Sequence, residues 1–164
     1  MTEMQNRITE CVNNAIQCFN QNEQYLISRD LSERCICAKF ASYLERTIAD
    51  SEFHDYVVDV EYNRGSRGNE YAAKKLEGHN IVVDLIVHKR NYCEQIGFDN
   101  LICIEMKKAY RHCDLSSDKQ RLKIMTDISF GFGYKAGFMI VAVADKKHGE
   151  YGLVIESSFY NRFF

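Results

Sequence analysis

The stretch IVVDLIVHKR at residues 81–90, followed by LICIEMKK at residues 101–108, decides the fold of this chain. Both segments are short, rich in Ile, Val and Leu, and end in polar residues, which is typical of β-strands. Asp84 stands between three apolar residues on either side. Strands this apolar belong inside a sheet that is covered on both faces. The two segments therefore predict the inner strands of an α/β protein, with a mixed sheet flanked by helices.

Two carboxylates are predicted to meet on these strands. Alternate residues of a strand share a face, so Glu105 and Lys107 project together, while the apolar residues beside them face the opposite layer. If the strands pair antiparallel with Asp84 opposite Glu105, His88 falls opposite Leu101. The two acids would then lie within roughly 5 Å of each other at Cβ, with an ammonium group two positions along.

Two interpretations of this pattern remain open. An E-x-K sequence on a strand is also compatible with a solvated face and a surface ion pair. However, an Asp within an apolar run is costly without a partner, and two close carboxylates repel each other unless a cation is present. An oxygen-rich pocket of this kind suits Mg²⁺ or Mn²⁺ better than zinc.

A third acid, Glu33, has two possible roles. At 100° per residue it lies on the same stripe of a predicted helix as Ile36 and Phe40, which would turn it toward the sheet. Alternatively, Asp30 caps this helix and Glu33 folds back as the partner in a capping box. One side chain cannot do both.

The remaining elements complete the order α-α-β-β-β-α-β-β. Residues 63–80 are Gly-rich and charged, which predicts a loop or an open hairpin end. The other predicted elements are helices at 4–20, 30–49 and 116–129 and strands at 56–62, 138–144 and 151–157.

Composition limits the classes of protein that this chain can belong to. With 164 residues, 46% hydrophobic side chains and a net charge of −2, we expect a single domain over residues 1–164, neither disordered nor histone-like. The longest apolar run, 138–144, is too short for a membrane helix. Seven cysteines without framework spacing and the absence of a signal-like start favour a cytoplasmic protein with reduced thiols.

The acids and the lysine together resemble a known group. Asp84 followed by Glu105-Met106-Lys107, with Glu33 on a preceding helix, resembles the PD-(D/E)xK nuclease superfamily. The likeness is closest to small, mostly uncharacterised bacterial members, and it spans about residues 30 to 128. The matching blocks are Leu31–Arg34, Glu61–Arg64, Val83–Arg90 and Asn100–Lys108.

Two departures from the superfamily pattern are visible. Val83 replaces the proline that precedes the metal-binding aspartate. That proline shapes the backbone and ligates nothing. Downstream, Asp118 with Arg121-Leu122 fits the pattern D-x-x-K-L only with Arg in place of Lys.

The resemblance implies a fold and a chemistry. The fold would be a restriction-endonuclease-like αβββαβ core with an extra N-terminal helix. The activity would be metal-dependent hydrolysis of phosphodiester bonds, with Mg²⁺ (Mn²⁺ possible) held by Asp84, Glu105 and the carbonyl of Met106. Lys107 would orient or help deprotonate the attacking water, and Glu33 would complete the shell.

Basic residues near this site suit a nucleic-acid partner, with DNA favoured, although a charge run is also compatible with a solvated face. The rival function is a catalytically inactive or partner-dependent adaptor of the same fold, acting through a homodimer or a defence-system partner. The aromatic residues 159–164 would dock onto the core of their own chain or form a dimer interface. The predicted nucleic-acid contacts are Arg64, Lys108, Arg111, Lys119 and Arg121.

Overall fold

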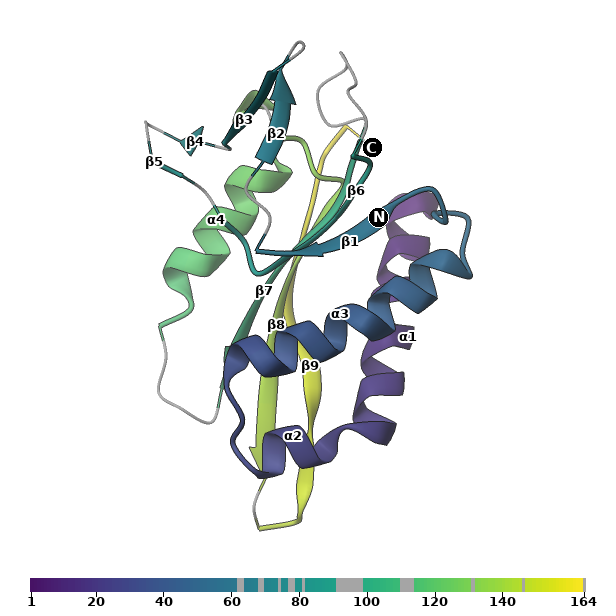
Figure 1. The fold of residues 1–164 in the computed structure, drawn as a ribbon, viewed down its shortest axis with the longest axis vertical. Helices are drawn as coiled ribbons and strands as arrows, with labels where there is room; N and C mark the ends of the chain where they lie inside the picture. Colours follow the sequence, from purple (N-terminus) through teal and green to yellow (C-terminus); the bar gives the residue numbers. More distant parts are fainter. Residues whose placement is uncertain are drawn as a thin grey trace.

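A computed structural model gives the fold of the chain (Figure 1). Between residues 62 and 81 it describes only the backbone of four short strands. Elsewhere it describes residues 1–61, 82–90, 99–109, 114–130, 132–145 and 147–163.

The described part of the chain contains helices and one main sheet, which confirms the α/β class. The helices are α1 (Glu3–Asn22), α2 (Gln24–Ser28), α3 (Glu33–Ala49), α4 (Ser116–Thr126) and the 3₁₀ helix η1 (Ile128–Phe130). The strands of the main sheet are β1 (Val57–Val60), β6 (Leu85–His88), β7 (Asn100–Lys108), β8 (Ala136–Asp145) and β9 (Glu150–Tyr160).

The main sheet is mixed, with strand order β1-β6-β7-β8-β9. β7 and β8 run parallel, and the other neighbours are antiparallel. A parallel pair needs a crossover between its strands, and α4 lies in the connection between β7 and β8. The two segments that decide the fold therefore lie inside the sheet, as predicted.

Each face of the sheet has its own helical layer. In Figure 1, α1 and α3 lie on one side of the sheet and α4 lies on the other. Ile102, Ile104 and Met106 pack toward α1 and α3, whereas Cys103 packs with the α4 layer. The alternation predicted for this strand is confirmed.

The N-terminal helix forms as its sequence predicts. Thr2 and Gln5 make a reciprocal capping box at its start. The apolar residues at helical spacing are buried against the sheet and α3. They are Ile8, Val12, Ile16 and Phe19.

Two predicted elements differ in the structure. Of the two alternatives for residues 63–80, the loop is wrong and the hairpin end is the nearer, because the segment contains two antiparallel strand pairs outside the main sheet. The predicted helix at 116–129 ends at Thr126, since Asp127 takes an extended backbone and its carboxylate accepts a hydrogen bond from the N–H of Ser129. The two strand pairs are β2 (Arg64–Arg67) with β3 (Glu70–Ala73), and β4 (Lys75–Leu76) with β5 (His79–Asn80).

The aromatic C-terminal segment docks onto the core as far as Asn161. The ring of Tyr160 packs edge-on against Phe138 at 6.2 Å, and Asn161 is buried. Phe163 is exposed. No helix in the described ranges is both long and apolar enough to cross a membrane.

Candidate functional site

The pairing of β6 and β7 brings the two central acids together. Leu85 pairs with Ile104, and continuing this register by one residue places Asp84 opposite Glu105. At the other end, a bulge moves the partner of His88 from the predicted Leu101 to Asn100, because one residue of β7 is left unpaired there.

Asp84 is held at the end of β6 by its neighbours. Its Oδ2 accepts a hydrogen bond from the N–H of Met106 at 2.7 Å. Its carbonyl accepts one from the N–H of Glu61 at 2.9 Å, and Glu61 has a positive φ of 51°, which is uncommon for a residue with a side chain. These contacts fix Asp84 between β7 and the end of β1.

Glu105 is buried on the α4 side of the sheet. Its Oε1 accepts a hydrogen bond from Arg121 Nε at 2.6 Å. Burial, together with the nearby carboxylates of Asp84 and Asp118, raises the pKa of Glu105 from 4.5 to about 8, although Arg121 opposes this shift. The site therefore contains a carboxyl group that favours its protonated form at neutral pH, even with Arg121 beside it.

Lys107 lies between two acids from different helices. Its Nζ is 3.8 Å from Glu33 Oε1 and 3.8 Å from Asp118 Oδ2. Burial disfavours the charged ammonium, but the acids, with Asp84 and Glu105 among them, outweigh burial and raise the pKa of Lys107. Lys107 is therefore a cation at neutral pH.

Glu33 faces the sheet. The capping residue of α3 is Ser32, whose hydroxyl accepts a hydrogen bond from the N–H of Cys35, so the alternative of a capping box between Asp30 and Glu33 is wrong. Glu33 Oε2 instead accepts a hydrogen bond from the N–H of Lys108 at 2.9 Å. The start of α3 thus places the Glu33 side chain against β7, the strand that bears Glu105 and Lys107.

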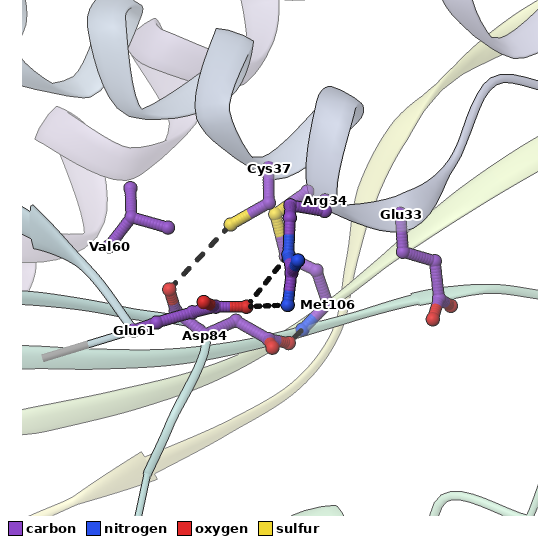
Figure 2. Close-up of a pocket in the computed structure, with 7 residues that line it drawn as sticks. All are labelled: Glu33, Arg34, Cys37, Val60, Glu61, Asp84 and Met106. Carbon is purple, nitrogen blue, oxygen red and sulfur yellow. Dashed lines mark hydrogen bonds and ion pairs between the residues drawn. The ribbon is translucent and has the colours of Figure 1, made fainter. Parts of the chain in front are cut away.

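A pocket of about 190 Å³ opens beside Asp84, between the start of α3 and the ends of β1 and β6. Figure 2 shows Arg34 paired with Glu61 and the Cys37 thiol directed at the Asp84 carbonyl. Burial, and then the charges of Asp84 and Glu61, raise the pKa of Cys37 to about 12, so this thiol is not a nucleophile. The pocket is lined by Glu33, Arg34, Cys37, Val60, Glu61, Asp84 and Met106.

The predicted nucleic-acid contacts fall into two groups. The side chains of Arg64 and Arg111 lie outside the described residues. The other three pair with acids of the same chain: Lys108 with Asp30, Lys119 with Glu156, and Arg121 with Glu105 and Asp118. Lys108 is buried and also donates to the carbonyl of Leu31, so it anchors the chain just before α3.

Asp118 is a site residue that the sequence analysis did not place among the candidates. It is 3% exposed, pairs with Arg121 one turn along α4, and its Oδ2 accepts no hydrogen bond from the described part of the chain. Its spacing of three residues from Arg121 was the available signal, because residues at i and i+3 share a helix face.

The donor chemistry fits a magnesium ion. Asp84 and Glu105 each use one carboxylate oxygen in the hydrogen bonds of the described residues, and Asp118 has a buried oxygen that accepts none. Oxygen donors are those that Mg²⁺ prefers. Within the described ranges, no three His, Cys, Asp or Glu side chains stand together as a metal-binding group.

Comparison with known proteins adds no relative: no protein-family model matches the chain, and no curated protein or solved structure matches it significantly.

Proposed function

We propose that this protein is a metal-dependent nuclease of the PD-(D/E)xK superfamily that hydrolyses phosphodiester bonds in nucleic acid, with DNA the favoured substrate. The observation that carries the proposal is the register that sets Asp84 opposite Glu105, with Lys107 on the same face of β7. This is the arrangement that the D…ExK pattern requires.

The order of elements supports the same proposal. With the four short strands between residues 64 and 80 set aside, the chain runs α3-β1-β6-β7-α4-β8. That is the αβββαβ order of the restriction-endonuclease-like core, and α1 is the extra N-terminal helix. The strands β7 and β8 are parallel, with α4 in the crossover between them.

Each site residue has a role in this chemistry. Asp84, Glu105 and the carbonyl of Met106 would hold the ion. A bound Mg²⁺ makes hydroxide available near neutral pH and stabilises charge that develops on the phosphoryl oxygens. Lys107, whose ammonium faces Glu33 and Asp118, would orient the attacking water or help deprotonate it.

The test is a cleavage panel with plasmid, linear duplex, single-stranded DNA and structured RNA, each in Mg²⁺, Mn²⁺ or EDTA. We expect cleavage that needs the metal and falls about 100-fold or more in Lys107→Ala and in Glu105→Gln. Lys123→Ala is the control, since Lys123 is an exposed cation on α4 that has no role in the proposed site. The melting temperature of each variant, measured by circular dichroism, separates lost chemistry from lost folding.

A second candidate is the partner-dependent or inactive adaptor, which the hydrogen bond from Arg121 to Glu105 favours because that bond occupies an expected metal ligand. Metal-dependent cleavage by the purified chain would contradict this candidate. No cleavage of any substrate, together with no Mn²⁺ binding by calorimetry, would contradict the nuclease.

A further inference from the structure

The guanidinium of Arg121 lies between two buried carboxylates. Its Nε donates to Glu105 Oε1 at 2.6 Å, and its Nη2 pairs with Asp118. The two acids are 2% and 3% exposed, whereas the Arg121 side chain is 35% exposed. Arg121 therefore reaches from the surface of α4 into the acidic centre of the site.

Arg121 offsets part of the electrostatic cost of burying Glu105 and Asp118. Two buried carboxylates without a cation would be strongly unfavourable, and Asp84 adds a third acid next to Glu105. Burial works against the charge on Arg121, but Glu105 and Asp118 outweigh it and raise the pKa of the guanidinium. Arg121 thus supplies a permanent positive charge at the place where the acids converge.

The acids keep binding capacity that Arg121 does not use. Among the described residues, Asp118 Oδ2 is buried without a hydrogen bond, and the ammonium of Lys107 lies 3.8 Å from it, beyond hydrogen-bond range. A single guanidinium satisfies one oxygen of each acid. A divalent ion carries twice the charge of Arg121 and accepts oxygen ligands from several directions.

We propose that Arg121 is the internal counter-cation of this site, and that a divalent metal ion displaces it from Glu105 on binding. The inference rests on the proposed function, because it takes Glu105 as a metal ligand. Arg121 is here a positioning residue: it offsets part of the negative charge of the site and holds the acids in place, and it competes with the metal for Glu105.

The competition has a measurable consequence. Metal binding to the wild-type chain must break the Arg121–Glu105 hydrogen bond, so the affinity for metal is lower than the carboxylates alone would give. Removing the guanidinium should tighten metal binding and, in the absence of metal, lower the stability of the fold. A merely structural ion pair would show the loss of stability without the gain in affinity.

The test compares Arg121→Gln with Lys123→Gln, which removes an exposed positive charge from the same helix. Mg²⁺ binding is measured by calorimetry, and thermal unfolding is followed with and without Mg²⁺. We expect the dissociation constant for Mg²⁺ to fall about fivefold or more in Arg121→Gln and to stay unchanged in Lys123→Gln. Arg121→Lys, which keeps the charge, should bind Mg²⁺ about as the wild type does and shows whether a fold defect explains the result.

The outcomes separate the two proposals. If the wild type binds Mg²⁺, Asp84→Asn does not, and folded Arg121→Gln binds equally or more weakly, the counter-cation inference is overturned while the metal site stands. If neither the wild type nor any variant binds Mg²⁺, the metal site itself is absent and both proposals fail.

Discussion

The two faces of the central sheet are made by the same strands but are built from different kinds of contact. One face is packed by α1 and α3 into a large apolar layer that includes Phe19, Phe40 and Phe138. The other is covered by α4, with a smaller apolar cluster and the charged group of Glu105, Asp118 and Arg121 beside it. The period of two in a strand lets β7 contribute to the stability of the fold on one side and place its chemistry on the other.

The difference in chemistry leads to a difference in free energy. Burying apolar surface stabilises the fold, whereas burying carboxylates is costly even when they are paired. We therefore expect the α1 and α3 face to carry most of the stability. On the α4 face, the loss of one buried carboxylate, that of Glu105, should raise the stability.

The largest effect is expected from neighbouring residues of β8 that point to opposite faces. Phe138 and Met139 are both fully buried, the first in the α1 and α3 layer and the second in the α4 layer. Phe138→Ala should lower the free energy of unfolding by about 3–5 kcal/mol, and Met139→Ala by about 2–3 kcal/mol. Urea denaturation of both variants measures the difference. An equal or larger loss in Met139→Ala would contradict the expectation that the α1 and α3 face carries most of the stability.

A smaller effect, of opposite sign, is expected at Glu105. Its pKa in the folded chain is about 8, above the ordinary 4.5, so between pH 5 and 8 the folded state keeps a proton that the unfolded state releases. The stability contributed by this proton is full below pH 4.5 and is lost as the pH rises through 8.

Glu105→Gln does not titrate, so its stability should exceed that of the wild type by an amount that grows from pH 5 to 8 and then levels off. The gain is on the order of a few kcal/mol. Melting temperatures of both proteins in EDTA across this range measure it. A constant difference at every pH would mean that Glu105 titrates normally and that the α4 face is less costly than its burial indicates.

The smallest effect is expected outside the charged group. Lys119 on α4 pairs with Glu156 on β9 at 2.7 Å, and both side chains are one-third exposed. Lys119→Ala should change the free energy of unfolding by less than about 1 kcal/mol, and less in high salt. Chemical denaturation in low and high salt checks this, and a larger loss would show that α4 depends on charge pairs well beyond Arg121.

The strand pairing and the separation of the two faces could be predicted from the sequence, because both depend on the alternation of side chains along each strand. Alternation in β7 puts Glu105 and Met106 on opposite faces. The register that buries the apolar residues of both strands pairs Leu85 with Ile104, which places Asp84 opposite Glu105. For Glu33, the helical stripe of α3 supplied one of the two roles that the sequence left open, and the structure shows this one, in which Glu33 faces the sheet. One unpaired residue in β7 was enough to displace the predicted partner of His88.

The contacts of Arg121 and the cap of α3 could not be predicted in this way. Whether Arg121 reaches a phosphate or Glu105, sixteen residues away, depends on how α4 crosses the sheet. Asp30 and Ser32 are both good capping residues, and Ser32 is the one that caps α3. Asp30 instead pairs with the ammonium of Lys108, a contact distant in sequence, and lies in the left-handed region with φ 56°.

The contacts between α1 and the end of β9 bear on how the chain folds as the ribosome makes it. The Gln5 amide donates to the Asn161 carbonyl at 3.0 Å, and the Thr9 hydroxyl lies 2.9 Å from that of Tyr160. Translation adds about 5–20 residues per second, so α1 emerges on the order of ten seconds before the strand that completes its site. Throughout that interval its apolar stripe lacks part of its native cover and is available to chaperones or to other nascent chains.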